Sequence, residues 1–189
     1  MKIALYFGSF NPIHSGHLII ASHVANYADY AQVWFIVSPQ NPFKAETSLL
    51  NEYDRLHLVR LAVEDDPRLK VSDIEFKLPR PSYTIDTLAY LTEKYPQHEF
   101  AILMGSDGFQ NLPKWKNADI LISSYSFIVY TRPGFPIIET HGTKLNLLDA
   151  PQLIISATYI RETLKAGKTI RYLVPDKVRA YIEENNYYK

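Results

Sequence analysis

The feature that most constrains the fold is a regular alternation of short apolar runs with stretches of helical periodicity. The first apolar run extends from Lys2 to Phe7 and is closed by Gly8, as expected of a strand buried on both faces. From Gly16 to Tyr30 apolar residues recur at spacings of three and four, which predicts a helix with one stripe facing the core. A strand, a glycine-containing loop and a helix in this order form the unit from which parallel sheets are built.

The same alternation continues along the chain, with glycine- and proline-rich turns between its members. Further strands are expected at Gln32–Val37, Leu69–Phe76, Phe100–Met104, Ser126–Tyr130 and Leu153–Ile155, and further helices at Leu49–Glu64, Thr84–Lys94, Ser156–Ala166 and Pro175–Glu184. Gly105–Gly108 and Arg132–Gly134 are expected to be loops that follow strands. Strands separated by helices imply right-handed crossovers, so the prediction is an α/β fold with a mainly parallel sheet and helices on both faces.

Helix ends carry signals of their own. Ser82 or Thr84 is the expected cap of the helix at Thr84–Lys94, Gly167 is the expected stop of the helix at Ser156–Ala166, and Pro175 is expected at the first position of the last helix. No repeat or low-complexity linker divides the chain, so residues 1–189 are expected to form one domain.

Composition excludes several classes of function. The chain has no cysteine, so zinc fingers and disulfide frameworks are excluded, and a reducing compartment is favoured. Twenty Lys and Arg balance twenty Asp and Glu, so no global field is present to hold a nucleic acid. The first apolar run is too short for a signal peptide, and no apolar run approaches the roughly 18 residues needed to span a membrane. We therefore expect a cytoplasmic protein with no nucleic-acid or membrane partner.

The loop after the first strand carries the first chemical pattern. It reads Gly8-Ser-Phe-Asn-Pro-Ile-His14-Ser-Gly16-His17, with two imidazoles three residues apart at the start of a helix. Free N–H groups of a helix N-terminus, a glycine that allows close backbone approach, and two imidazole donors together suit a multiply charged phosphate.

Plainer interpretations compete with this one. Gly8 can serve only a turn, one histidine can serve only as a cap, and the pair can be a fragment of a metal site. The metal interpretation is disfavoured because the chain has no cysteine and no obvious third ligand. The loop matches neither GxGxxG nor GxxxxGK[ST], so the dinucleotide and P-loop patterns find no support.

The second pattern lies near the end of the chain. Ser156 and Thr158 stand at an expected helix N-terminus, where hydroxyls cap or hold phosphate, and the planar fork of Arg161 follows one turn later. Taken alone, this segment can also be a capped helix whose arginine pairs with a glutamate.

Together the two patterns resemble the GxFxPxHxGH and ISxTxxR signatures of the nucleotidyltransferase superfamily. That resemblance implies a Rossmann-like fold and transfer of a nucleoside monophosphate from a triphosphate to a phosphorylated acceptor, with release of pyrophosphate. Within this superfamily, the middle of the chain resembles the bacterial nicotinate-nucleotide adenylyltransferases. With the two signatures included, this resemblance extends along nearly the whole chain. The matching segments are Asn41-Pro-Phe-Lys44, Arg55, Ser82-Tyr-Thr84 with Thr87-Leu88, Gly105-Ser-Asp107, Leu112-Pro-Lys-Trp115, Arg132-Pro-Gly134 and Tyr172-Leu-Val-Pro175 with Val178 and Tyr181-Ile182.

The resemblance implies ATP and nicotinate mononucleotide as substrates and deamido-NAD as product. It gives catalytic roles to His14, His17, Lys44 and Arg161. It gives ATP contacts to Gly8, Ser9, Phe10, His14, Gly16, His17, Gly105, Asp107, Ile155, Ser156, Thr158 and Arg161. It gives acceptor contacts to Lys44, Ser82, Tyr83, Thr84, Trp115 and Arg132.

These residue types suit their expected partners. A flat pyridine carboxylate needs an aromatic face, which Trp115 offers, and hydroxyl or N–H donors, which Tyr83 and Thr84 offer. Mg²⁺ is expected on the substrate phosphates with no metal site of the protein's own, and no tightly bound organic cofactor is expected. The sequence leaves open a homo-oligomer.

The chain departs from the family pattern at two positions, and both the acceptor and the function have alternatives. Phe7 stands where the family often has glycine, and Asn11 where it often has aspartate, so Asn11 is not assigned to metal binding. Nicotinate and nicotinamide differ by one donor–acceptor swap, and no unambiguous cation is placed to decide between them; the resemblance favours nicotinate. The alternatives are a nucleotidyltransferase with another acceptor and a nucleotide-binding regulatory module without turnover.

Overall fold

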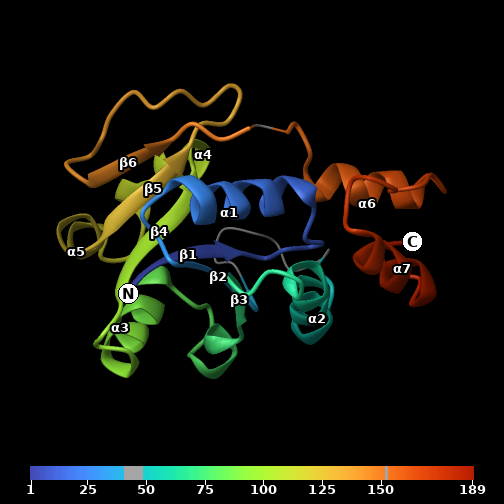
Figure 1. Ribbon diagram of the computed structural model, residues 1–189, viewed down its shortest axis with the longest axis horizontal. Coiled ribbons are helices and arrows are strands. Elements are labelled where there is room, and N and C mark those ends of the chain that lie inside the picture. Colours follow the sequence, from blue (N-terminus) through green and yellow to red (C-terminus); the bar gives the residue numbers. More distant parts are fainter. Residues whose placement is uncertain (41–48, 152) are drawn as a thin grey trace.

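A parallel sheet forms the centre of the computed structural model, which describes residues 1–40, 49–151 and 153–189 (Figure 1). In this part of the chain six strands lie in the order β3-β2-β1-β4-β5-β6, and every neighbouring pair is parallel. The strands are β1 Lys2–Gly8, β2 Gln32–Val37, β3 Leu69–Ser72, β4 Glu99–Gly105, β5 Ser126–Tyr130 and β6 Lys144–Leu148.

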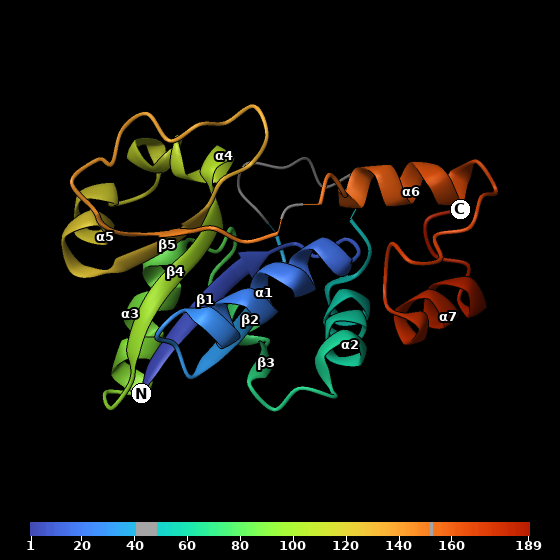
Figure 2. The same ribbon diagram turned by 45° about the horizontal axis from the view of Figure 1, so that its top comes forward.

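Helices cover both faces of this sheet, as predicted (Figures 1 and 2). Within the described ranges the α-helices are α1 Ser15–Tyr27, α2 Glu52–Val63, α3 Thr84–Lys94, α4 Ser106–Phe109, α5 Ala118–Ser124, α6 Ala157–Lys165 and α7 Asp176–Glu184, and the 3₁₀ helices are η2 Ile74–Lys77 and η3 Leu112–Lys114. Figure 2 shows α6 and α7 together at one end of the molecule, next to α2.

Strand β1 explains why both faces must be covered. Ala4 and Tyr6 belong to the apolar cluster that contains α1, α2, α6 and α7, whereas Ile3 and Leu5 belong to the cluster that contains α3. All four side chains are buried. Full burial of an aliphatic side chain of this size contributes roughly 1.5–3 kcal/mol, so a strand with two apolar faces is stable only between two layers of helix.

The strand order places a switch point at the centre of the sheet. From β1 the chain moves outward through β2 to β3, and from β4 it moves outward in the opposite direction through β5 to β6. Because the crossovers leave in opposite directions, the loops after β1 and β4 part and open a crevice at the carboxyl ends of these strands. The fold therefore predicts the place of the site.

The strand expected at Leu69–Phe76 is wrong in its second half. β3 ends at Ser72, and residues Ile74–Lys77 form the 3₁₀ helix η2. The hydroxyl of Ser72 accepts a hydrogen bond from the backbone N of Ile74 at 3.3 Å. Such a local side-chain bond offers the backbone an alternative to the sheet, which explains the early end of the strand.

The strand expected at Leu153–Ile155 is also wrong, and the sixth strand is β6 instead. Leu153 and Ile155 line a cavity, and Ile154 is exposed. The apolar residues of this segment are therefore not buried in a sheet. β6 was missed because it is an edge strand with mostly exposed residues and lacks a continuous apolar run.

The remaining differences concern short elements and helix ends. Gly105–Gly108 is not a loop, since α4 begins at Ser106. Neither Ser82 nor Thr84 caps α3; Tyr83 holds the N-cap position without a side-chain bond. Pro175 is the N-cap of α7 rather than its first residue. Gly167 follows α6 with a φ of 67°, as a helix stop requires. None of the helices among the described residues is long and apolar enough to cross a membrane.

Candidate active site

A cavity of about 1030 Å³ lies at the switch point, at the carboxyl ends of β1, β4 and β5. Every site residue expected from the sequence and described by the structure lines it: Gly8, Ser9, Phe10, His14, Gly16, His17, Ser82, Tyr83, Thr84, Gly105, Asp107, Trp115, Arg132, Ile155, Ser156, Thr158 and Arg161. Lys44 lies outside the described residues. Segments far apart in the sequence therefore meet in one place.

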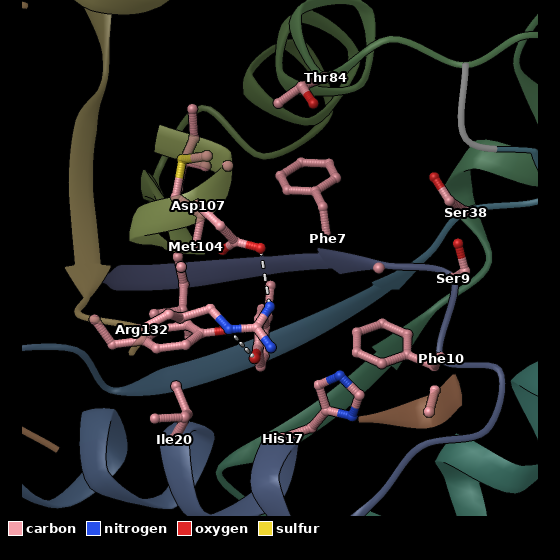
Figure 3. A pocket seen from close by; sticks show the side chains of 18 of the residues that line it. Phe7, Ser9, Phe10, His17, Ile20, Ser38, Thr84, Met104, Asp107 and Arg132 are labelled. Atoms are coloured by element: carbon pink, nitrogen blue, oxygen red, sulfur yellow. Dashed lines mark hydrogen bonds and ion pairs between the residues drawn. The ribbon is translucent and has the colours of Figure 1, made fainter. Parts of the chain in front are cut away.

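The loop after β1 packs tightly beneath the cavity. An added Cβ at Gly8 would lie 2.8 Å from Cζ of Phe10, so this close approach requires glycine. Phe10 is buried and its ring contacts those of Tyr6, Phe35 and His17, with centroids 5.8, 5.4 and 5.1 Å away. Figure 3 shows His17 and Phe10 side by side in the cavity wall. Phe10 thus anchors the loop that carries the histidines.

The two histidines stack on each other at the start of α1. Their ring centroids are 3.7 Å apart, and the backbone N of His14 donates to Nδ1 of His17 at 3.3 Å. Because Nδ1 of His17 accepts, the proton of that ring lies on Nε2, which can donate. An added Cβ at Gly16 would lie 3.1 Å from the His14 ring, so Gly16 makes room for it.

His14 is held uncharged. Its side chain is buried, and burial together with the positive charge of Arg132 lowers its pKa from 6.5 to about 4. Two buried polar atoms of this loop, Nδ1 of His14 and Oγ of Ser9, have no hydrogen-bond partner among the described residues. An unsatisfied buried polar atom costs about 1–3 kcal/mol, and an anion with several acceptor oxygens can satisfy it.

Arg161 ties the second pattern to the first. Its Nη1 donates to the backbone carbonyl of Asn11 at 2.8 Å, and its Nη2 donates to Oγ1 of Thr158 at 3.2 Å. Ser156 caps α6 by accepting from the backbone N of Tyr159 at 3.1 Å. Among the described residues Arg161 forms no ion pair with a glutamate, so the interpretation as a plain helix with an Arg–Glu pair is not favoured.

Asn11 is itself a junction. Its Oδ1 accepts from the backbone N of Leu50 at 3.1 Å and from the hydroxyl of Tyr188 at 2.9 Å. Burial raises the pKa of Tyr188 well above its ordinary value, so this hydroxyl keeps its proton and donates. The residue that departs from the family pattern therefore fixes the loop.

At the other side of the cavity, Asp107 and Arg132 form an ion pair. Nη1 of Arg132 donates to Oδ2 of Asp107 at 2.9 Å, as Figure 3 shows, and the backbone N of Arg132 donates to Oγ of Ser106 at 2.8 Å. An added Cβ at Gly105 would lie 2.6 Å from Oδ1 of Asp107, which explains the glycine. Arg132, which is expected to contact the acceptor, thus forms its ion pair with Asp107, which is expected to contact ATP.

The N-terminus of α3 forms a further wall with Tyr83, Thr84 and Trp115. Lys116 also lines this wall and was missed by sequence analysis. Its Nζ lies 4.7 Å from the centre of the Tyr83 ring and 2.8 Å from Oδ2 of Asp86. The sequence offered no signal for this contact, because only the fold brings Lys116 next to Tyr83 and Asp86 at the start of α3.

Two other wall residues also went unnoticed in the sequence. Glu75 is buried, and the hydroxyls of Ser38, Ser82 and Thr87 all donate to its carboxylate. Tyr130 shares a hydrogen bond of 3.0 Å with the hydroxyl of Tyr6, and burial raises the pKa of both phenols. Among the described residues, no group of three or more His, Cys, Asp or Glu is arranged to hold a metal ion.

Comparison with known proteins agrees with this geometry. The model of the cytidylyltransferase-like family matches residues 5–163. The sequence is 50% identical to a protein of Flavobacterium psychrophilum and 49% identical to one of Flavobacterium johnsoniae, each over 100% of both chains, and both are named probable nicotinate-nucleotide adenylyltransferase.

A solved structure shares the fold. The nicotinic acid mononucleotide adenylyltransferase of Plasmodium falciparum, in complex with NaAD, has a TM-score of 0.84 at 22% identity and covers 99% of this chain and 97% of its own. Family model and full-length relatives together show that the chain belongs to the cytidylyltransferase-like family and, within it, to the nicotinate-nucleotide adenylyltransferases.

Proposed function

We propose that this chain transfers the adenylyl group of ATP to nicotinate mononucleotide in the biosynthesis of NAD. A phosphate oxygen of the acceptor attacks the α-phosphorus of ATP and forms the new P–O bond. The bond from the α-phosphorus to the oxygen that bridges to the β-phosphorus breaks, and pyrophosphate leaves with the electron pair. The products are nicotinate adenine dinucleotide (deamido-NAD) and pyrophosphate.

One observation carries the proposal: the bond from Arg161 to the carbonyl of Asn11 joins the two signature segments at a single cavity. That cavity presents a cationic fork, two stacked imidazoles and the N-termini of α1 and α6. These are the groups that bind phosphate oxygens.

The acceptor phosphate is largely ionised at neutral pH, so the reaction needs positioning and charge stabilisation rather than a base. His14 and His17 donate to oxygens of the α-phosphate as negative charge grows there. The low pKa of His14 means that its ring is a neutral imidazole near pH 7, so it can donate through one nitrogen only. Arg161 and Lys44 neutralise the phosphates, and Asp107 accepts from the ribose hydroxyls.

The acceptor ring lies against the wall of Trp115, Tyr83 and Thr84. Trp115 supplies an aromatic face, and Tyr83 and Thr84 supply donors at the start of α3, where no side chain caps the helix. The N-terminus of α3 favours a negatively charged group, which suits a pyridine carboxylate.

ATP enters with Mg²⁺ on its phosphates. Among the described residues the carboxylates that line the cavity are Glu75 and Asp107. Glu75 accepts three hydroxyl bonds and Asp107 pairs with Arg132. This donor set suits an ion that arrives on substrate phosphates better than one held by the protein. We treat MgATP as the substrate.

We further propose that residues 1–189 act as one nucleotidyltransferase domain in the cytoplasm. The sheet with its two flanking apolar clusters runs from β1 at the start of the chain to α7 near its end, which supports the first statement. A chain without cysteine suits a reducing compartment, which supports the second.

The test is release of pyrophosphate from MgATP with nicotinate mononucleotide, nicotinamide mononucleotide or phosphopantetheine as acceptor. We expect the highest kcat/KM with nicotinate mononucleotide. A preference for phosphopantetheine would replace the acceptor while keeping the reaction class. Binding of ATP without release of pyrophosphate in the presence of any of the three acceptors would favour a regulatory binding module and refute the proposal.

A further inference from the structure

Two buried charges stand beside the cavity and have no part in the reaction as described so far. Arg55 of α2 is 0% exposed and Glu75 of η2 is 1% exposed. Charged side chains are almost never buried to this degree unless their hydrogen bonds are satisfied. Their partners therefore show what the two residues do.

Arg55 binds backbone carbonyls on three segments. Its Nη1 donates to Ser9 at 2.5 Å and to Ser38 at 2.8 Å, its Nη2 to Pro39 at 3.0 Å, and its Nε to Leu50 at 2.8 Å. Ser9 lies in the loop after β1, Ser38 and Pro39 follow β2, and Leu50 precedes α2. The planar guanidinium thus ties these three segments together through their carbonyl groups.

Glu75 binds hydroxyls on the opposite side of Ser38. Its Oε2 accepts from Oγ of Ser38 at 2.5 Å and from Oγ of Ser82 at 2.7 Å, and its Oε1 accepts from Oγ1 of Thr87 at 2.9 Å. Ser82 stands next to Tyr83 and Thr84 in the wall assigned to the acceptor. Glu75 therefore holds the start of α3 against the end of β2.

Ser38 joins the two charges. Its carbonyl accepts from Arg55, its hydroxyl donates to Glu75, and its backbone N donates to the carbonyl of Gly8 at 2.9 Å. Figure 3 shows Ser9 and Ser38 beside each other on the cavity wall. We call Arg55, Ser38 and Glu75 the buried bridge, since they connect the histidine-bearing loop to the acceptor wall.

We propose that the residues of the buried bridge are positioning residues that set the spacing between the bound ATP and the bound acceptor. The proposal rests on the proposed function. In-line attack needs the acceptor oxygen and the α-phosphorus within about 3–3.5 Å, and a misplacement of about 1 Å can cost on the order of 10² in rate. A fully hydrogen-bonded buried network holds such spacing more closely than apolar packing, because its bonds are directional.

The bridge is best cut at Ser38. Ser38→Ala removes the bond to Glu75 and leaves the carbonyl that Arg55 binds. We expect kcat to fall about 10- to 100-fold, while KM for ATP and for nicotinate mononucleotide change less than about threefold. The matched control is Ser72→Ala: Ser72 ends the neighbouring strand β3, its hydroxyl accepts a local bond from Ile74, and it does not line the cavity.

A second pair of variants separates hydrogen bonding from charge. In Glu75→Gln the amide oxygen can accept from Ser38 and Ser82, and the amide nitrogen can donate to Oγ1 of Thr87. The Thr87 hydroxyl can then donate to the carbonyl of Tyr83, 3.3 Å away. Glu75→Leu removes every one of these bonds. We expect Glu75→Gln to keep kcat within about threefold, and Glu75→Leu to lose at least as much as Ser38→Ala.

The results are read against the wild type in the same pyrophosphate assay. The proposal would be overturned by an unchanged kcat in Ser38→Ala, by an equal loss of kcat in Ser72→Ala, or by an effect of Ser38→Ala on KM alone. Equal losses in Glu75→Gln and Glu75→Leu would overturn it too. If Glu75→Leu fails to fold, Ser38→Ala and Glu75→Gln still decide. A wild type that releases no pyrophosphate with nicotinate mononucleotide refutes the proposed function instead.

Discussion

His14 makes a defined contribution to the pH dependence of folding. In the folded protein its pKa falls from 6.5 to about 4, first because the ring is buried and then because Arg132 lies nearby. Between these two pH values the unfolded chain binds a proton that the folded protein excludes. The free energy of unfolding therefore falls as the pH is lowered through this window. The contribution of His14 to that free energy is fully present only above about pH 6.5.

The magnitude follows from the two pKa values. A change from 6.5 to about 4 corresponds to about 3 kcal/mol over the whole window. Of this, about 2 kcal/mol is lost between about pH 7 and pH 5, where the unfolded histidine becomes almost fully protonated and the folded one stays mostly neutral.

The measurement is urea unfolding of the wild type and of His14→Gln at pH 7 and pH 5. Glutamine removes the titrating ring and keeps a polar side chain. We expect the wild type to lose about 2 kcal/mol more than the variant over this interval. His23→Gln, which changes a histidine of the same helix outside the cavity, controls for the loss of an imidazole as such. The same pH dependence in wild type and His14→Gln would refute the buried neutral ring.

Three more predictions follow from the site. His17→Asn should lower kcat by about 10²- to 10³-fold in the pyrophosphate assay, since it removes a donor to the α-phosphate, and a change of only a few fold would contradict that role. Lys116→Met should lower kcat/KM about tenfold for nicotinate mononucleotide and leave that for nicotinamide mononucleotide unchanged, because its ammonium lies over the acceptor wall. The control is Lys94→Met, since the Lys94 ammonium also lies over a tyrosine ring but does not line the cavity. An unchanged ratio between the two acceptors would rule out the selectivity. Gly8→Ala should destabilise folding by about 1–3 kcal/mol in thermal unfolding, because the new Cβ would meet Phe10 at 2.8 Å, whereas an unchanged Tm would mean that the loop can relax.

The central part of the fold could be predicted because its signals are local. β2, α3 and β5 have the bounds that periodicity predicts, since each carries a continuous apolar pattern between turn residues. β6 could not be predicted in this way. Most of its residues are exposed at the sheet edge, and its pairing with β5 is a tertiary interaction that leaves little trace in its own residues.

The site residues likewise fall into those that local motifs predict and those that only tertiary contacts reveal. His14, His17 and Arg161 lie in motifs, and the rule that ligands bind at the carboxyl ends of parallel strands brings them together. Glu75 and Lys116 could not be found from the sequence. Each becomes part of the cavity wall only through partners contributed by other segments, Ser38 and Ser82 for the first and Tyr83 for the second.

The most direct test of the account follows the oxygen atoms of the reaction. Nicotinate mononucleotide carrying ¹⁸O in its phosphate is incubated with the protein and unlabelled MgATP, and the products are identified by mass spectrometry. The account predicts one dinucleotide per pyrophosphate, with all of the label in nicotinate adenine dinucleotide and none in pyrophosphate. Label in pyrophosphate, or release of pyrophosphate with AMP and no dinucleotide, would contradict attack of the acceptor phosphate on the α-phosphorus of ATP.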